Sequence, residues 1–435
     1  MSKGKARALL PIGVFLVLYL GLGFTLEFGM GVEMGFYQIP IVVVFLVALL
    51  FACLQNRQLT FDDKLGVMAK GIGDKTLMTM ILIFLVAGVF VGTVGRSSAE
   101  SVAYFMLSII PPDCSVAVLF IIACFVSISM GTSVGTITLI TPIAISVAQA
   151  GGFSIPLCIG AVMGGAMFGD NLSFISDTTI AACQGQGCKM KDKFRENFKI
   201  ALPAALITLF VTLALSMGTG SPDPIQNDYN LLQLIPYLLV LAGGIIGINV
   251  FVVLLIGIIS GAIIVLATGT VEGFELLGNM GTGVSGMFET AMVAILVTAI
   301  CALVREYGGF DALLNGIRSL FKGRRGGQAG VGLLVLLIDI ATANNTVAII
   351  VANPIAAEMG KIYGISKRRI ASLLDTFSCV SQGILPYGAQ MLVALAAATT
   401  MGVTVGAFEV IPCLFYPFIL LFCSLAYIAL SKKNK

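Results

Sequence analysis

The chain of 435 residues has 58% hydrophobic residues, only 11% charged residues and a net charge of +3. A soluble protein of this length could not cover its surface with so few charges, so the composition excludes a soluble multidomain enzyme. Apolar runs of roughly 18 or more residues, the length that crosses a bilayer as a helix, recur along the chain. Because the chain has no histidine, an imidazole metal site or proton relay is also excluded.

Hydropathy divides the chain into spans, and the first follows Lys3, Lys5 and Arg7. This run lacks an A-x-A-like cleavage site and is followed by more apolar runs, so we expect a transmembrane helix and not a signal peptide. The expected spans lie near residues 8–26, 36–55, 76–95, 157–182, 200–217, 230–246, 248–268, 287–304, 370–397 and 410–430. The amphipathic segments 60–74, 97–110 and 311–322 are expected to be interfacial arms.

Two further apolar stretches, 115–150 and 329–358, contain the same arrangement of small and polar residues 212 positions apart. The polar runs are Gly131–Thr136 and Ala343–Ala348, and each is followed by a proline at the same offset. Paired interruptions of this kind are typical of the binding site of a secondary transporter. We expect each stretch to be a re-entrant hairpin that enters and leaves on one side. Two full crossings per stretch remain the alternative.

The basic residues are strongly asymmetric in this arrangement, because 24 of the 25 Lys and Arg residues fall on one side and only Arg96 on the other. The positive-inside rule makes that side cytoplasmic, with both termini there, in a multi-pass protein of the cell inner membrane. The basic segment Lys189–Lys199 is interpreted as a cytoplasmic loop that sets topology. The first hairpin then opens outward and the second inward, which makes the halves an inverted-topology repeat.

The fold class predicted from these patterns is an all-α polytopic membrane protein with about ten transmembrane helices plus two re-entrant hairpins. The chain is expected to begin with an N-terminal transmembrane hairpin (1–59) and to end with a cytoplasmic tail (431–435). The first inverted repeat (60–217) contains hairpin 115–150 and broken helix 157–182, and the second (272–430) contains hairpin 329–358 and broken helix 370–397. Connecting transmembrane helices (218–271) join the two repeats.

Asp170 and Asp177 lie inside what should be a single crossing. A charge at mid-membrane costs about 3 kcal/mol on insertion scales, so both are functional candidates, with helix capping as the structural alternative. If the chain is helical there, Ser173 and Asp177 are one turn apart and Asp170 is one turn further back on the same face. The equivalent segment of the second half is neutral, with Gln382 and Ala389 at these positions.

The hairpin tips, 130–136 and 342–346, are rich in hydroxyl and amide groups. Such groups and exposed carbonyls can replace the hydration shell of sodium, and the ends of half-helices add partial charge. Hydrogen bonds that merely join helices are the alternative interpretation. Asp339 and Asp375 are further acids in apolar segments of the second half, where a structural role is as well supported as a functional one.

The segment from Gly169-Asp170 through Ser173 to Ser176-Asp177-Thr178-Thr179 resembles the G-D-x-x-S-x-x-S-D-T-T stretch of the NhaC family of sodium/proton antiporters, within the ion transporter superfamily. Asn344-Asn345-Thr346 also resembles the hairpin motif of the divalent-anion/sodium symporters. The resemblance covers about residues 60–430. It implies that the hairpin tips and the breaks in the following helices hold sodium and substrate.

From the hairpins, the broken helices and this resemblance we derive two sets of site residues. The sodium-binding candidates are Thr132, Ser133, Thr136, Gly169, Asn344, Asn345, Thr346, Gln382 and Gly383. The candidates for binding substrate or protons are Asp170, Asn171, Ser173, Asp177, Thr178, Asp375, Ser378 and Gln390. No resident cofactor is expected, and Na⁺ and H⁺ are the expected coupling ions.

The predicted function is sodium-linked secondary active transport of a small solute by alternating access. An amino acid is favoured as cargo, because tip amides can hold its carboxylate and an aspartate its ammonium group. The alternative is a Na⁺/H⁺ antiporter in which an intramembrane aspartate exchanges sodium for protons. No nucleophile–base pair suggests an enzyme. The expected partners are the lipid bilayer, the solute and the ions, without nucleic acid, and a homodimer is left open.

Overall fold

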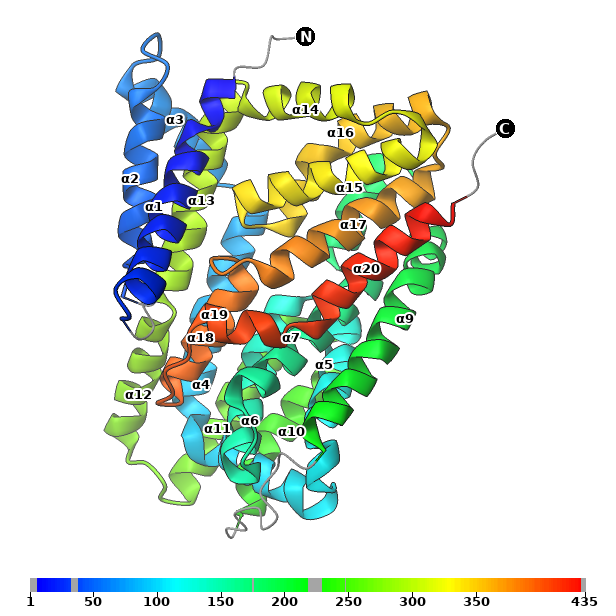
Figure 1. The fold of residues 1–435 in the computed structure, drawn as a ribbon. Coiled ribbons are helices and arrows are strands. Elements are labelled where there is room, and N and C mark those ends of the chain that lie inside the picture. Colours follow the sequence, from blue (N-terminus) through cyan, green and yellow to red (C-terminus); the bar gives the residue numbers. More distant parts are fainter. Residues whose placement is uncertain (1–5, 33–37, 174–175, 218–228, 247, 432–435) are drawn as a thin grey trace.

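The computed structural model describes residues 6–32, 38–173, 176–217, 229–246 and 248–431 (Figure 1). Every regular element in these ranges is a helix, which confirms the all-α prediction. By length and composition, eight of the described helices can cross a membrane, or nine if the bent pair at Ala407–Ala429 counts as one span. Three predicted spans form shorter apolar helices: α2 (Ile41–Leu54), α10 (Leu231–Ile246) and α11 (Val250–Ala267).

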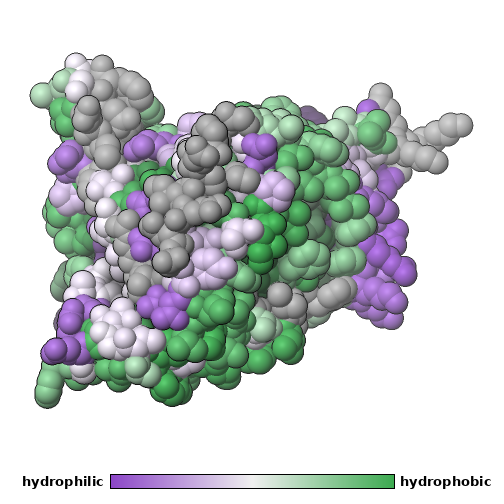
Figure 2. All heavy atoms as spheres, turned by 90° about the horizontal axis from the view of Figure 1, so that it is seen from below, coloured by the Kyte–Doolittle hydropathy of each residue, from purple (hydrophilic) through white to green (hydrophobic). Residues whose placement is uncertain are grey.

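The flanks of the molecule are apolar, as lipid contact requires. Large hydrophobic side chains are exposed on several helices, for example Val17 (72%), Phe210 (69%) and Ile263 (62%). Figure 2 shows broad hydrophobic areas around the molecule with smaller hydrophilic patches between them. In a soluble protein such a surface would aggregate, whereas in a bilayer it faces lipid tails of the same polarity.

The helices of the two halves follow the same order along the chain, and two long helices of the first half each correspond to two shorter helices of the second. Those of the first half are α3 (Phe61–Ile72), α4 (Lys75–Ile109), α5 (Ser115–Met130), α6 (Ser133–Gly151), α7 (Ile155–Leu172), α8 (Asp177–Gln186) and α9 (Met190–Ser216). Those of the second half are α12 (Gly273–Gly286), α13 (Phe288–Glu306), α14 (Gly309–Leu320), α15 (Gly323–Thr342), α16 (Asn345–Tyr363), α17 (Lys367–Ile384), α18 (Ala389–Thr400), α19 (Ala407–Val410) and α20 (Phe415–Ala429). Outside both lies α1 (Leu10–Phe24), which packs on α2.

The offset of 212 residues also relates the first and last residues of individual helices. Both α6 and α7 begin and end 212 residues before α16 and α17, respectively. Cys379 Sγ on α17 lies 3.3 Å from the carbonyl oxygen of Met167 on α7, and these two residues are also 212 apart. A residue that touches its own counterpart lies on the axis relating the halves, so a pseudo-two-fold axis passes between them. We propose on this basis that 60–217 and 272–430 are the repeat units.

Each polar interruption forms the tip of a helical hairpin. In the first hairpin α5 ends at Gly131, which has φ +68°, and Thr132 caps α6 by accepting a hydrogen bond from the Gly135 amide at 3.4 Å. In the second, Ala343 takes the left-handed conformation (φ +46°) and Asn344 caps α16. Figure 1 shows the two hairpins at opposite ends of the molecule with both tips directed toward its middle.

The two broken helices lie next to these tips. α7 ends at Leu172 and α8 begins at Asp177, and Ser173 and Ser176 between them have extended backbone (ψ 139° and 138°). The prediction that Ser173 and Asp177 share a helical face with Asp170 is therefore wrong. Only a helical backbone would place them one turn apart, and the chain leaves the helix at Ser173. The equivalent break separates α17 from α18.

The three predicted arms differ from one another. Residues 61–72 form α3, whose first turn is fixed by a capping box between Thr60 and Asp63. Residues 309–320 form α14, across the end of the molecule where α1 begins and α20 ends (Figure 1). The third, 97–110, continues α4 after a break at Gly95 (φ +62°), and its Ala99 and Ala103 are fully buried. This last segment is packed into the protein and not only onto a membrane surface.

α4 and α12 approach closely through glycines, which gives a stability prediction. A Cβ atom on Gly283 would lie 2.1 Å from the carbonyl oxygen of Gly88, whereas one on Gly281 of the same helix would meet nothing within 4 Å. We expect Gly283→Ala to destabilise the protein by roughly 1–3 kcal/mol, because the helices must separate. Gly281→Ala is the matched control and is expected to be neutral or slightly stabilising. Equal thermal unfolding midpoints of the two variants in detergent would contradict this packing.

Candidate functional site

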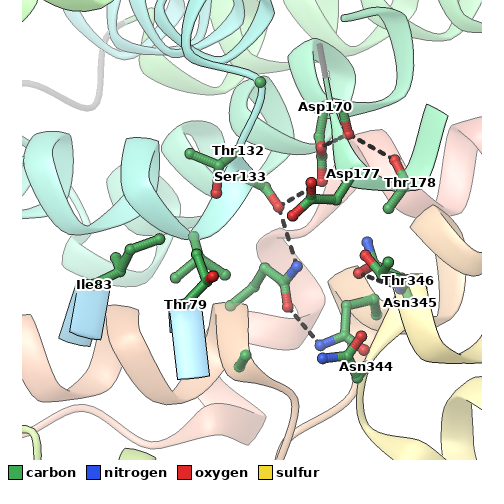
Figure 3. A pocket seen from close by; sticks show the side chains of 16 residues that line it. Thr79, Ile83, Thr132, Ser133, Asp170, Asp177, Thr178, Asn344, Asn345 and Thr346 are labelled. Carbon is green, nitrogen blue, oxygen red and sulfur yellow. Dashed lines mark hydrogen bonds between the residues drawn. The ribbon is translucent and has the colours of Figure 1, made fainter. Parts of the chain in front are cut away.

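A cavity of about 60 Å³ lies where the hairpin tips meet the helix breaks. Figure 3 shows that its side chains come from both repeats, with Ser133 and Asp170 from the first and Asn344 and Asn345 from the second. Among the described residues that line it, only Asp170 and Asp177 are charged, and both are acidic. The cavity therefore favours a cation.

Asp170 is held between the first hairpin and the first helix break. Its Oδ2 accepts a hydrogen bond from Ser133 Oγ at 2.8 Å, and its Oδ1 accepts one from Ser176 Oγ at 2.5 Å. The Ser176 and Thr178 hydroxyls are also 2.8 Å apart. Asp170 is 6% exposed, and no described Lys or Arg forms an ion pair with it. Hydroxyl hydrogen bonds stabilise the carboxylate only in part, so a cation or a proton is still required.

A continuous hydrogen-bond path joins Asp170 to the second repeat. Ser133 Oγ accepts from Gln390 Nε2 at 3.1 Å, and Gln390 Oε1 accepts from Gln382 Nε2 at 2.5 Å. Gln382 Nε2 also lies 3.2 Å from the carbonyl oxygen of Ala343 at the second hairpin tip. The Oε1 atom of Gln382 is buried without a hydrogen-bond partner. The path thus connects both hairpins and both breaks, and it leaves one free acceptor oxygen at the cavity.

The polar pairs at the two breaks are counterparts. Gln382 and Gln390 stand 212 positions after Asp170 and Thr178, so an amide pair in the second repeat replaces the acid and hydroxyl of the first. Each break also places a helix N-terminus at the cavity, as does each hairpin, since the first residues of α6, α8, α16 and α18 all line it. The positive ends of these helices reduce the cost of burying the carboxylate.

Of the predicted site residues, ten line this cavity. They are Thr132, Ser133, Asp170, Asp177, Thr178, Asn344, Asn345, Thr346, Gln382 and Gln390. Asp177 is exposed, whereas Asp170 is buried, so the two acids differ in environment. Further lining residues that the sequence interpretation missed are Thr79, Ile83, Gly131, Val134, Ser176 and Ala389. Of these, Ser176 had a detectable signal, because it precedes Asp177 in the family-like stretch.

The other seven predicted residues do not line the cavity. Gly169 and Gly383 are packing positions, since a Cβ atom would lie 2.4 Å from Ser127 and 2.8 Å from Pro417, respectively. Ser173 Oγ donates to the carbonyl oxygen of Ile128, and Thr136 Oγ1 donates to that of Thr132. The remaining three are Asn171, Asp375 and Ser378, and they lie in or beside a separate buried cluster.

That cluster centres on Lys193, which is 1% exposed. Its Nζ pairs with Asp375 on α17 and donates to the Asn171 carbonyl at 2.8 Å and to Thr179 Oγ1 at 2.7 Å. Asn197 donates to the same Asn171 carbonyl and to Asp375, both at 3.0 Å. The interpretation of Lys189–Lys199 as a loop is therefore wrong, because most of it is the start of α9. Lys193 joins both repeats and holds both sides of the first break.

A wider space leads toward the site from the end of the molecule where α14 lies. A cavity of about 340 Å³ is lined by Lys70, Asp74, Arg305 and Glu306 at one end and by Asn344 at the other. A smaller cavity of about 20 Å³ is lined mainly by apolar side chains such as Leu77, Val297 and Leu392. Asn344 lines all three spaces. This asparagine therefore borders both the wide cavity and the site that contains Asp170.

Hairpin tips and broken helices from both halves of the chain that enclose a buried carboxylate are the arrangement of a secondary active transporter. The comparison with known families agrees with this class. The Na⁺/H⁺ antiporter family matches residues 39–217 and 229–431. The chain belongs to this family, and the resemblance to NhaC proteins is confirmed.

Characterised relatives of the chain are antiporters of several kinds. It is 24% identical to the Na⁺/H⁺ antiporter NhaC of Alkalihalophilus pseudofirmus, over 90% of this chain and 89% of the relative. It is 27% identical to the malate-2H⁺/Na⁺-lactate antiporter of Bacillus subtilis, over 76% and 74%. The transporter YdaH of Alcanivorax borkumensis is a structural neighbour at 15% identity, with a TM-score of 0.43 over 81% of this chain and 86% of that one.

Proposed function

We propose that this protein exchanges sodium for protons across the membrane, with Asp170 binding the two cations alternately. The observation that carries the proposal is a buried carboxylate at a cavity whose other described charged residue, Asp177, is also acidic. The cavity of about 60 Å³ is large enough to admit a cation together with water. Membership of the Na⁺/H⁺ antiporter family supports the same conclusion.

In this mechanism the deprotonated Asp170 provides the charge for sodium. Gln382 Oε1 and the Ser133 and Thr132 oxygens provide neutral ligands of the kind that hard cations prefer. When sodium leaves, a buried carboxylate with only hydroxyl partners is too costly to remain charged, so it takes up a proton. Because the two cations need the same carboxylate, they compete, and this competition couples their movements in opposite directions.

The test uses purified protein in proteoliposomes that contain a pH indicator. An outward sodium gradient without any organic solute is expected to acidify the lumen, and reversal of the gradient is expected to reverse the pH change. A protonophore should abolish the signal. Sodium movement that leaves the internal pH unchanged would exclude the proposed exchange.

Amino-acid transport remains the second candidate, supported by the cavity of about 340 Å³ beside Asn344. Its volume is within the range of small-molecule sites, and its lining offers both basic (Lys70, Arg305) and acidic (Asp74, Glu306) groups. The arginine/ornithine antiporter ArcD of Halobacterium salinarum is a relative at 21% identity. A panel of labelled amino acids in the same proteoliposomes separates the two candidates, since sodium-dependent uptake of one of them would establish organic cargo.

Removing the hydroxyl that joins Asp170 to the second repeat should weaken sodium binding. We expect Ser133→Ala to raise the sodium concentration for half-maximal exchange by roughly tenfold, since a hydrogen bond to a charged group contributes about 1.5 kcal/mol. Thr138→Val is the matched control on the same helix, because its buried hydroxyl bonds only to the Val134 carbonyl and does not line the cavity. Sodium dependence that is equal in both variants would remove Ser133 from the site.

A further inference from the structure

Asp339 is a third buried aspartate beside Asp170 and Asp375, and the mechanism above does not use it. It lies on α15, four residues before the tip residue Ala343, and its exposed fraction is 0%. Its Oδ2 is hydrogen-bonded to Ser381 Oγ on α17, and its Oδ1 is buried without a partner. No described Lys or Arg forms an ion pair with Asp339.

The three buried aspartates differ in what compensates their charge. Asp375 pairs with Lys193, and Asp170 has two hydroxyl donors and borders a cavity that can admit a cation. Asp339 has one hydroxyl partner and lines none of the described cavities around the tips. An isolated charge in such surroundings is so unfavourable that the group takes up a proton instead.

The hydrogen-bond count around Ser381 agrees with a neutral acid. Its hydroxyl group has one proton but lies near three oxygens: Asp339 Oδ2 and the carbonyls of Phe377 and Ser378, each of the latter at 3.1 Å. If Asp339 carries a proton, it donates to Ser381 Oγ, and the Ser381 proton is free to reach a carbonyl. The Asp339 proton and the Ser381 proton then each form one hydrogen bond.

The residue equivalent to Asp339 in the first repeat is not an acid, and this difference distinguishes the two halves. The counterpart of Asp339 in the first half is Ser127, which donates to the Ala166 carbonyl at 2.6 Å and joins hairpin to broken helix without an acid. In the first repeat the acid is on the broken helix and the hydroxyl on the hairpin, as Asp170 and Ser133. In the second repeat this order is reversed, because Asp339 is on the hairpin and Ser381 on the broken helix.

The titratable groups around Asp339 do not offer it a positive charge. Tyr387 donates to the Ile340 carbonyl at 2.7 Å, Cys301 contacts the Ala341 carbonyl at 3.2 Å, and Cys379 faces Met167. On the helices packed against α15, the basic groups lie at helix ends, such as Lys361 on α16 and Arg369 on α17. Arg369 is in addition bonded to Gln328 and near Glu196.

We propose that Asp339 is a second proton-carrying carboxyl group, coupled to Asp170 through α17. This inference rests on the proposed sodium/proton exchange. Ser381, which contacts Asp339, is adjacent to Gln382, which belongs to the path leading to Asp170. When the second hairpin moves, Asp339 separates from Ser381, meets water and releases its proton, and it takes up another on the opposite side. Each cycle then moves one more proton than Asp170 alone exchanges for sodium.

Two variants and two measurements test this inference. Infrared spectroscopy of the wild-type protein at neutral pH and saturating sodium, where Asp170 holds sodium and no proton, is expected to show the carbonyl band of a protonated carboxyl group, which Asp339→Asn and Asp339→Ser should each remove. Asp339→Ser is the variant designed to fold, because it places at this position the residue used in the first repeat. In proteoliposomes, the coupling ratio should fall by one proton per sodium ion in both variants.

The outcomes separate the two proposals. A carboxyl band and a coupling ratio that are unchanged in Asp339→Ser would overturn the role of Asp339, while sodium/proton exchange would stand. If the wild type shows no sodium-driven proton movement, the proposed function fails. In that case the loss of the band in Asp339→Ser would still show that this acid is protonated in the membrane.

Discussion

Asp170→Asn is expected to abolish sodium/proton exchange while the protein remains folded and inserted in the membrane. Asparagine keeps the shape of the side chain and can still accept from Ser133, but it has no charge for sodium and no site for a transferable proton. Insertion itself should become easier, because the desolvation cost of the carboxylate is removed. The measurement is sodium-driven pH change in proteoliposomes, normalised to the amount of inserted protein.

Three controls define what a loss in Asp170→Asn means. Asp62→Asn removes an equally small acid from the exposed surface of α3 and should leave exchange unchanged. Asp177→Asn should have a smaller effect than Asp170→Asn, because Asp177 is exposed. Gln382→Ala should also be milder, since it removes a neutral ligand. Normal exchange in Asp170→Asn together with loss in Gln382→Ala would place the chemistry in the second repeat.

Lys193→Met is expected to cause the largest loss of stability. Lys193 and Asp375 are each 1% exposed, so the substitution leaves a buried carboxylate without its ion-pair partner and leaves the Asn171 carbonyl with Asn197 as its remaining donor. Removal of one member of a buried ion pair costs roughly 3–5 kcal/mol. We expect a clearly lower unfolding midpoint in detergent and little folded protein in the membrane.

The double variant Lys193→Met with Asp375→Leu should recover much of that stability, because two apolar side chains of similar volume replace the whole pair. The same comparison shows whether the pair has a role beyond stability. If the double variant is stable but inactive, Lys193 positions the break between α7 and α8 for exchange. A single Lys193→Met variant as stable as the wild type would contradict the buried pair.

The repeat could be predicted from the sequence because it depends on local backbone chemistry. Thr132 and Asn344 are helix caps with side-chain acceptors, and Gly131 supplies the left-handed residue before the first cap. Such signals lie within a few residues of each other and recur 212 positions later. The apolar runs likewise made the class of the protein evident, since only a bilayer accommodates them.

The positions of the acids could not be predicted in the same way. The residue spacing predicts Ser173 beside Asp177 on a helical face, but the backbone leaves the helix between them, and Ser176 is the partner of Asp170. The charge pattern predicts Lys193 in a cytoplasmic loop, because basic residues usually mark membrane edges. Its burial depends on Asp375, which is 182 residues away in the chain and meets it only when the two repeats pack together.

The sequence by itself thus determined the membrane class, the 212-residue offset between the halves and the tips at which the chain leaves its helices, because hydropathy and capping act over short distances. Only the tertiary structure decided which acid has which partner: Asp375 a lysine, Asp170 two hydroxyls beside a cavity, and Asp339 a single serine. The physical reason is that the cost of a buried charge depends on groups brought together from distant parts of the chain, which no local pattern records.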